Sequence, residues 1–547
     1  MIALNERRHT VNPVVAILLL GTLNACDQSS GSTTAEPVLP ETFAIRSIDG
    51  SGNNAQSPFM GAAGTKLIRQ VASDYADDVS QMAGPNRTNA RTISNIVHQR
   101  PATDQRNSLR ASDFVWQWGQ FVDHDIDLTP GADPVEAAFI PIPKGDPDFD
   151  PTGSGAMFMK FERSTYDTST GTGPDNPRQQ LNMITTWIDA SNVYGSDAIR
   201  AEALRTNDGT GKLKTSDGDL LPFNVDGLPN AGSTDPDMFL AGDIRANEQA
   251  ALTSMHTLFV REHNRLADVI RNRESEYTGD QIYQRARRIV GAQMQAITYN
   301  EFLPVLLGPG AIAPYSGYDP TVDASICNVF STALYRFGHS ALSPTLLRLN
   351  ASGSVIPAGN LPLRRAFFAP NLIIDEGGIE PLLRGLSRQV HEDVDVFIID
   401  DVRNMLFGPP GSDGFDLATL NIERGRDHGL PSYNETRKSY GLAPAQSWSD
   451  ISSDPDIQAR LSSVYATVDD VEVWVGSLAE DHVSGMVGEL TLWAMTGQFE
   501  ALRDGDRFWY KRTLNDADLQ EVTTLANIIR RNTSIGSEIQ DNVFLVP

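Results

Sequence analysis

Sulfur is scarce in this chain of 547 residues, which has only two cysteines, Cys26 and Cys327. Two cysteines exclude a disulfide-rich scaffold and any metal cluster that is held by four thiolates. Basic residues are also few, because 44 lysines and arginines stand against 70 aspartates and glutamates, for a formal net charge of -26. Proteins that bind nucleic acid need a positively charged face. The charge balance therefore argues against that class and suits an exported, soluble protein.

Long hydrophobic runs are also missing. The apolar run at 14–20 follows Arg7 and Arg8 and is far shorter than the roughly 20 residues of a membrane-spanning helix. A basic start, a short apolar core and then small residues predict an export signal at 1–25. The segment Leu23-Asn24-Ala25-Cys26 resembles a bacterial lipoprotein box, which would make Cys26 the lipidated first residue of the mature protein. An ordinary cleaved signal, with secretion, is the alternative.

The remaining chain predicts a tether followed by one large domain. Residues 26–42 are small and polar, which is typical of a flexible tether. Residues 43–547 contain no internal repeat, and their periodicity predicts a mainly α domain with long loops and little β structure. Apolar residues recur at helical spacing at 114–122, 247–273, 282–303 and 321–340, whereas the Gly/Pro/Asp-rich stretches 130–155 and 205–240 predict loops.

Two of the nine histidines stand in unusual settings. His124 lies between two aspartates on an otherwise apolar helix, where polar groups are costly to bury unless they have partners. Gln120 lies one turn earlier on the same helical face. His339 ends an apolar segment beside Gly338, which leaves room for a bulky group to approach the backbone.

The other histidines have simpler interpretations. His256 and His263 share the apolar stripe of one predicted helix, where a shared metal is geometrically possible but a buried, hydrogen-bonded pair is favoured. His98, His391 and His482 have polar neighbours and are expected to be exposed. His428 precedes a glycine that is suited to cap the end of a helix.

Four separated segments, at 119–129, 245–248, 336–339 and 420–429, resemble the animal-type haem peroxidases of the peroxidase–cyclooxygenase superfamily. They occur in the family's order, and the resemblance extends from about residue 43 to the end of the chain. It implies an exported bacterial member of the lactoperoxidase and myeloperoxidase type. The expected fold is a mainly helical single domain at 43–547 around a buried haem b.

The resemblance assigns the residues that hold the haem. His339 is the expected axial ligand of the haem iron through Nε2, and Asn421 is the expected acceptor for its Nδ1–H. Arg336 and Arg424 match positions that bind the haem propionates, with surface salt bridges as the alternative.

The resemblance also assigns the residues that act on peroxide. His124 is the expected base and then acid, and Arg245 supplies a fixed positive charge while negative charge develops. Gln120 is expected to orient peroxide or a small anion by hydrogen bonding.

Two carboxylates, Asp123 and Glu248, match the family residues that form ester bonds to haem methyl groups. Unmodified carboxylates that line the pocket are the alternative. The family's sulfonium-forming methionine is replaced by Gln249, so no sulfonium link is expected.

A calcium site is implied beside the distal helix. The resemblance gives Asp125, Thr185, Trp187, Asp189 and Ser191 as its ligands, with Trp187 contributing only its backbone carbonyl. In an extended loop, alternate residues present their oxygens to one side, and such hard oxygen ligands suit calcium.

The resemblance implies an oxidoreductase that reduces hydrogen peroxide through a ferryl intermediate and oxidises a halide, thiocyanate or a small aromatic donor. Fatty-acid dioxygenases of the same superfamily place a tyrosine three residues before the proximal histidine. Arg336 occupies that position here and Tyr335 lies one residue off, which disfavours that alternative. A non-catalytic surface or adhesion protein is the third possibility. No nucleic-acid partner is expected, and membrane contact is expected only through a lipid on Cys26, at the outer face of a bacterial membrane.

Overall fold

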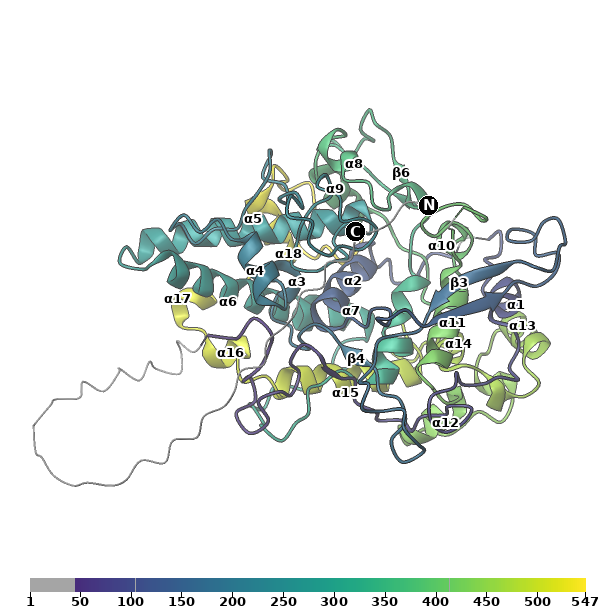
Figure 1. The fold of residues 1–547 in the computed structure, drawn as a ribbon. Helices are drawn as coiled ribbons and strands as arrows, with labels where there is room; N and C mark the ends of the chain where they lie inside the picture. Colours follow the sequence, from purple (N-terminus) through teal and green to yellow (C-terminus); the bar gives the residue numbers. More distant parts are fainter. Residues whose placement is uncertain (1–44, 104, 413) are drawn as a thin grey trace, which may run out of the picture. The chain divides into compact units, whose positions relative to one another are not determined.

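The computed structural model describes residues 45–103, 105–412 and 414–547. The part from Ile45 to Pro547 forms one compact unit, whereas the predicted signal and tether lie outside the described residues. Helices dominate this unit, and among its described residues the named strands occur only as two-stranded antiparallel pairs (Figure 1). The prediction of a mainly α fold is therefore confirmed.

The helices are, in chain order, α1 (Ala90–Val97), α2 (Phe114–Ile126), α3 (Ser191–Tyr194), α4 (Ala198–Leu204), α5 (Ala250–Arg273), α6 (Gly279–Ile297), α7 (Leu303–Leu306), α8 (Asn371–Ile374), α9 (Glu380–Arg388), α10 (Asp400–Arg403), α11 (Leu417–Asp427), α12 (Tyr433–Ser439), α13 (Pro455–Val464), α14 (Val473–Ala479), α15 (Glu489–Asp504), α16 (Tyr510–Thr513), α17 (Asp516–Leu519) and α18 (Leu525–Asn532). The strand pairs are β1 (Thr65–Lys66) with β4 (Leu181–Asn182), β2 (Ala137–Pro141) with β3 (Phe158–Glu162), and β5 (Thr345–Leu346) with β6 (Leu361–Pro362).

Helix α2 lies in the core and packs against α3 and α5. Its aromatic residues Trp118 and Phe121 are fully buried, and the Phe121 ring stacks on Phe259 of α5 with 5.2 Å between the ring centroids. The apolar face that the sequence predicted for this helix is thus covered on several sides. Burial of such aromatic surface stabilises the fold and fixes the position of the polar residues near the end of α2.

The long helices α5 and α6 lie side by side (Figure 1), and α5 packs against α2. The side chain of Gln249 accepts a hydrogen bond from the backbone N–H of Ala251 at 2.7 Å and so caps the start of α5. Helix α6 starts with a capping box, in which Thr278 and Gln281 exchange side-chain and backbone hydrogen bonds. The predicted helices at 247–273 and 282–303 are confirmed within a few residues.

Two predictions about local structure are wrong. The segment 321–340 is not one helix, because Cys327 makes a backbone bridge to Ile68 and regular helical structure begins only after it. A π-helical turn then spans Phe330–Leu334 and a 3₁₀ turn spans Arg336–His339. The predicted loop at 130–155 contains β2, whose ladder with β3 pairs Phe139 with Lys160.

The expectation of exposed histidines is also wrong at two positions. His98 and His391 are both fully buried. The imidazole of His98 contacts the carbonyl oxygen of Val396 at 2.6 Å, and its ring lies 4.8 Å from the indole of Trp474. Polar neighbours in sequence mislead here, because distant residues provide the burial. No helix in the described ranges has the length and apolar character needed to span a bilayer.

Candidate active site

A cavity of about 480 Å³ lies between α2, α11, the segment before α5 and the 3₁₀ turn. The predicted haem-site residues that line it are Gln120, Asp123, His124, Arg245, Glu248, Arg336, His339, Asn421 and Arg424. These residues come from four distant segments of the chain, so their convergence is a result of the tertiary fold.

Helix α11 positions the predicted partner of His339. Asp416 caps the start of this helix and accepts hydrogen bonds from the backbone N–H groups of Ala418 and Thr419. One turn later, Asn421 lies with its Nδ2 atom 2.7 Å from Nδ1 of His339. Burial, together with the charge of Arg336, lowers the pKa of His339 to about 3. The imidazole is therefore neutral at physiological pH, which is the form that binds metals.

The amide of Asn421 has the opposite orientation to the expected one. Its Oδ1 atom accepts a hydrogen bond from Nη1 of Arg336 at 3.0 Å, so its Nδ2 donates to Nδ1 of His339. Axial ligation through Nε2 requires a proton on Nδ1 and hence the amide oxygen beside it. Arg336 also donates to the carbonyl oxygen of Ser331 at 3.1 Å. The guanidinium of Arg336 thus sets the amide orientation.

The distal side is organised by Asp243, which lies two residues before Arg245. Its Oδ1 and Oδ2 atoms accept hydrogen bonds from Nε and Nη2 of Arg245 at 2.8 and 2.9 Å. Such a bidentate pair fixes the plane of the guanidinium. The same carboxylate lies 3.6 Å from Nδ1 of His124. Although burial acts in the opposite direction, Arg245 and His124 hold the pKa of Asp243 below its usual range.

His124 is buried and uncharged. Burial and the nearby charge of Arg245 lower its pKa well below the usual value. Its Nε2 atom lies 3.9 Å from Oε2 of Glu248, which also accepts a hydrogen bond from Nε2 of Gln120 at 3.1 Å. A neutral imidazole beside a fixed positive charge is able to accept a proton and return it.

Two carboxylates, Asp123 and Glu248, face the same cavity. Burial raises the pKa of each to about 7, and Arg245 opposes the shift in both cases. Oδ2 of Asp123 lies 3.5 Å from Nη1 of Arg245. Gln249 also lines the cavity, and its side chain is engaged by its capping bond and by a 2.5 Å hydrogen bond from its Nε2 to Oε1 of Gln117.

Arg424 lines the cavity but has protein partners. Its Nη1 atom donates to Oγ of Ser164 at 2.8 Å and to Oδ2 of Asp427 at 3.0 Å. Its guanidinium also lies over the ring of Phe161, 4.3 Å from the ring centroid. Arg424 thus forms a salt bridge with Asp427, and it nonetheless lines the cavity.

The residues present fit a haem group. A Cβ atom added to Gly338, which lines the cavity, would find its nearest neighbour, a Trp116 side-chain atom, only 4.0 Å away. Burial and the charge of Arg424 lower the pKa of Arg336, so a negatively charged group beside it would stabilise its charged form. An apolar ring with two carboxylates would fill the open space beside Gly338 and neutralise the charge of Arg336.

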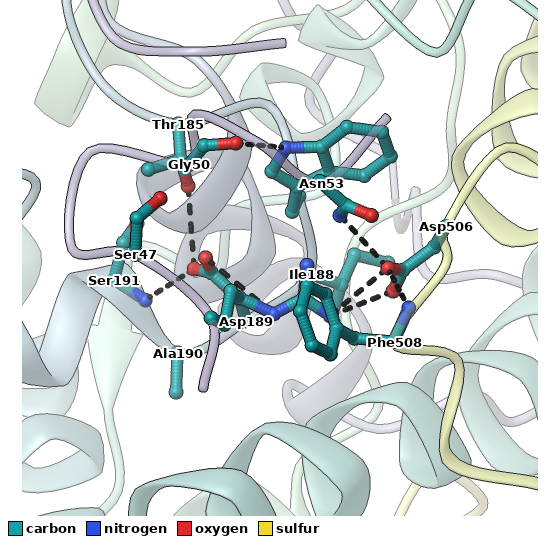
Figure 2. A network of polar contacts seen from close by, with 12 residues as sticks. Ser47, Gly50, Asn53, Thr185, Ile188, Asp189, Ala190, Ser191, Asp506 and Phe508 are labelled. Carbon is teal, nitrogen blue, oxygen red and sulfur yellow. Dashed lines mark hydrogen bonds and ion pairs between the residues drawn. The ribbon is translucent and has the colours of Figure 1, made fainter. Parts of the chain in front are cut away.

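The predicted calcium ligands Thr185, Asp189 and Ser191 lie close together (Figure 2), and Asp125 near the end of α2 is hydrogen-bonded to their loop. Asp125 accepts backbone N–H bonds from Asp189 at 3.1 Å and a hydrogen bond from Oγ of Ser191 at 3.1 Å. Thr185 donates to Oδ1 of Asp189 at 3.2 Å, whereas Oδ2 of Asp189 is buried without a hydrogen bond to a described residue. The loop is not extended throughout, because Ser191 begins α3. Trp187 is fixed by its indole, which donates to the carbonyl oxygen of Gly50 at 3.1 Å.

This donor set fits a hard cation. Burial raises the pKa of Asp125 to about 8, with the nearby Asp189 as the next cause, so two carboxylates compete for the same buried space. Arg46 lies 4.0 Å from Oδ2 of Asp189 and compensates part of this charge. A calcium ion would compensate the remainder, and hydroxyl and carbonyl oxygens would complete its coordination. The described residues hold no group of three or more His, Cys, Asp or Glu side chains suited to a metal. A cation bound here would therefore need neutral oxygens as its remaining ligands.

Sequence reasoning missed three residues of the cavity wall. Asp127, Tyr335 and His428 all line it. Asp127 accepts a hydrogen bond from Ser331, and its backbone oxygen accepts one from Nη2 of Arg245 at 2.9 Å. His428 does end α11 as predicted, but its imidazole contacts Oγ1 of Thr332 and Oγ of Ser164, each at 2.8 Å. His428 lies in the same motif, 420–429, as Asn421. This proximity in sequence is the signal that could have placed His428 in the cavity wall. The unnoticed Asp243 lay in the same short segment as Arg245.

The domain is helical, and its cavity has a neutral histidine on two opposite walls, a fixed arginine and space for a flat anionic group. These features define a haem-binding oxidoreductase. The chain belongs to the animal haem peroxidase family, whose model matches residues 45–544. Family membership implies a haem group, a peroxide substrate and an electron donor. It confirms the resemblance that the four sequence segments indicated.

Individual relatives agree with this assignment. Peroxinectin A of Dictyostelium discoideum is 37% identical over 524 residues, which cover 91% of this chain and 95% of that protein. Thyroid peroxidase of Sus scrofa is 35% identical, and the match covers 90% of this chain but 59% of that longer protein. The structure of peroxidase A from Dictyostelium discoideum superimposes with a TM-score of 0.86 at 35% identity, covering 92% of this chain and 99% of that one. A fatty acid alpha-dioxygenase of Arabidopsis thaliana shares the fold, with a TM-score of 0.78, at 20% identity.

Proposed function

We propose that this protein is a haem peroxidase that reduces hydrogen peroxide and oxidises a halide, thiocyanate or a small aromatic donor. The observation that carries the proposal is the presence of His124, Arg245 and His339 in the wall of one cavity. A scaffold that only binds partners needs none of these three side chains in that arrangement. Bound haem would supply the iron that takes two oxidising equivalents from peroxide.

The roles of the distal residues follow from their contacts. His124 removes a proton from peroxide and returns it to the departing oxygen, because its buried imidazole is neutral at working pH. Arg245 stabilises the negative charge that develops between these two steps. Asp243 positions both side chains and prevents the guanidinium from turning away. Gln120 orients the substrate by a hydrogen bond.

On the proximal side, His339 would hold the iron and Asn421 would orient its imidazole. Arg336 and Arg424 would bind the propionates. When a propionate takes the guanidinium of Arg336, Oδ1 of Asn421 loses its donor and the amide is able to turn its oxygen to His339. Asp123 and Glu248 would form ester bonds to haem methyl groups, and the support for this is that both carboxyl groups line the cavity.

The test combines a spectrum with a rate. Purified protein loaded with haem should show a Soret band that shifts on addition of peroxide, and it should oxidise a phenol or iodide. His124→Gln should keep its haem and lose about 10² to 10⁴-fold in its rate with peroxide. His482→Gln, at an exposed histidine, is the matched control. Haem-loaded protein that does not react with peroxide would refute the proposal.

Fatty-acid oxygenation is the second candidate, since alpha-dioxygenases share the fold. Arg336 in place of the tyrosine argues against it. Oxygen consumption on addition of a fatty acid, without added donor, would favour this candidate over the peroxidase.

We also propose export, with Cys26 as a lipidated first residue. The support is the pattern of 1–26, which lies outside the described residues. Intact-mass measurement of the membrane fraction tests it, and a mature protein that starts elsewhere would contradict it.

A further inference from the structure

Tyr335 is a pocket residue that the proposed reaction does not use. It lines the cavity, its side chain is 5% exposed, and its hydroxyl makes no hydrogen bond to any described residue. Burial raises its pKa well above 10, so the phenol remains protonated. A tyrosine in this position is oxidisable, and it is placed at the edge of the space that haem would fill.

Aromatic rings connect Tyr335 to a distant part of the domain. Its ring centroid lies 5.7 Å from that of Phe499 in α15, and Phe499 lies 6.1 Å from Tyr299 in the π-helical turn Thr298–Phe302. Tyr299 meets the indole of Trp509 edge-on at 5.0 Å. Trp509 in turn lies 5.7 Å from Tyr315. Each ring therefore contacts the next.

The two ends of this series differ in exposure. Trp509 is 2% exposed and belongs to a small hydrophobic cluster beside α16, whereas Tyr315 packs against that cluster and is partly exposed. The guanidinium of Arg503 lies 5.7 Å from the Tyr315 ring, but Asp504 pairs with it through two hydrogen bonds. The positive charge that would oppose oxidation of Tyr315 is thus compensated.

Tyrosine and tryptophan are among the side chains that lose one electron most readily. Phenylalanine does not, so Phe499 acts only as a bridge between Tyr335 and Tyr299. Rings in van der Waals contact give electrons a continuous path for tunnelling. The order of these side chains leads from the cavity wall to Tyr315, which is partly exposed although its hydroxyl is buried.

We propose that Tyr335, Tyr299, Trp509 and Tyr315 form an electron-transfer chain that oxidises phenolic donors too large to enter the cavity. The inference rests on the proposed peroxidase function, because hydrogen peroxide is the oxidant. One peroxide and two phenols give two waters and two phenoxyl radicals. Each phenol loses one electron and the proton of its O–H bond. The electrons pass inward along the chain, the protons are consumed with them in forming water, and every side chain returns to its initial state.

The experiment compares a free phenol with the same phenol coupled to a large dextran. Haem-loaded wild-type protein should oxidise both. Trp509→Phe and Tyr315→Phe should lose at least about tenfold in rate on the coupled phenol and keep the free-phenol rate within about twofold. Tyr283→Phe is the matched control, because it removes another buried hydroxyl whose ring contacts Tyr194 and His263 instead.

A second readout follows the radical itself. With peroxide and a nitroso spin trap but no donor, peptide mapping should find an adduct on Tyr315 in the wild type and none in Trp509→Phe. Tyr299→Phe should also lose the rate on the coupled phenol and the adduct on Tyr315. This second variant keeps the test decisive if the tryptophan substitution disturbs folding.

The outcomes separate the chain from the peroxidase activity. If the free phenol is oxidised but the coupled phenol is not, or if the variants match the wild type on both readouts, the chain is wrong and the peroxidase proposal stands. If neither phenol is oxidised and peroxide leaves the spectrum unchanged, both proposals fail.

Discussion

His339 and His256 are two uncharged imidazoles with different surroundings. His339 faces the cavity, whereas His256 is fully buried in α5 beside the ring of Phe121. We expect His339→Ala to lose stable haem binding, because the other imidazole near Asn421, that of His428, is already engaged by Thr332 and Ser164. His256→Ala should keep one haem per chain and lower the free energy of unfolding by about 2–4 kcal/mol, as expected for a cavity in the core. Haem content per chain and denaturant unfolding measure the two effects. Full haem occupancy in His339→Ala would contradict the assignment.

At the residue scale, the sequence motifs predicted which side chains meet but not how they bond. His124, Arg245 and His339 were identified because each lies in a motif with a family match, and the fold brings them to one cavity. The orientation of Asn421 was not predictable, since it depends on Arg336 from another segment. Asp243 was overlooked for a related reason. An aspartate two residues before an arginine is common, and only the folded geometry shows its bidentate contact.

At the scale of elements, the loop 185–191 fastens the end of α2. Asp125 directly follows His124 and is bonded to the backbone of that loop. We expect exhaustive chelation of calcium to reduce peroxide turnover before the helical circular dichroism changes, because loss of the ion would remove a link between Asp125 and the loop and loosen the end of α2 that carries His124. Turnover, metal content and circular dichroism on one sample provide the test. Unchanged turnover at verified zero metal would show that no calcium site of this kind exists.

The start of α2 predicts a pH effect on stability. Asp113 is buried, accepts a hydrogen bond from Oγ of Ser343 at 2.7 Å, and has its pKa raised to about 7 by burial. Its carboxyl group stays protonated in the folded chain over a range where the unfolded chain has lost the proton. Stability from this group is therefore full below about pH 4 and is lost as pH rises to about 7, by on the order of 4 kcal/mol.

Asp113→Asn isolates this contribution, since its amide oxygen still accepts from Ser343. The difference in unfolding free energy between wild type and variant should change between pH 4 and pH 7 and level off above that range. Urea unfolding at several pH values measures it. A constant difference would mean that Asp113 does not titrate as its burial implies.

Helix prediction succeeded where one periodicity runs uninterrupted, as in α5 and α6. It failed at 321–340, although the apolar spacing there is similar. The backbone of Cys327 pairs with Ile68, and the turns that follow are π-helical and 3₁₀. These turns reorient the chain so that His339 reaches the cavity. Hydrophobic periodicity indicates which face of a segment is buried. It does not distinguish 3₁₀, α and π turns, whose backbone hydrogen bonds differ in span by one residue.

At the scale of the whole molecule, the net charge of -26 affects the choice of donor. The long-range field repels anions, although Arg245, Arg336 and Arg424 line the cavity itself. We expect the rate of thiocyanate oxidation to rise several-fold between about 0.01 M and about 0.15 M ionic strength, because salt screens the repulsion. The rate for an uncharged phenol should stay constant and serves as the control. A falling thiocyanate rate would show that the cavity arginines dominate the approach of anions.

The composition of the cavity wall also determines that cofactor binding follows synthesis of most of the chain. Its lining residues extend from Trp116 to His428, and the proximal side depends on Asn421 in α11. A ribosome has therefore synthesised most of the chain before any segment exists that could close the cavity. Cofactor capture must follow synthesis, when residues far apart in sequence have already met. A cell that exports this chain unfolded would have to deliver haem to the far side of its membrane.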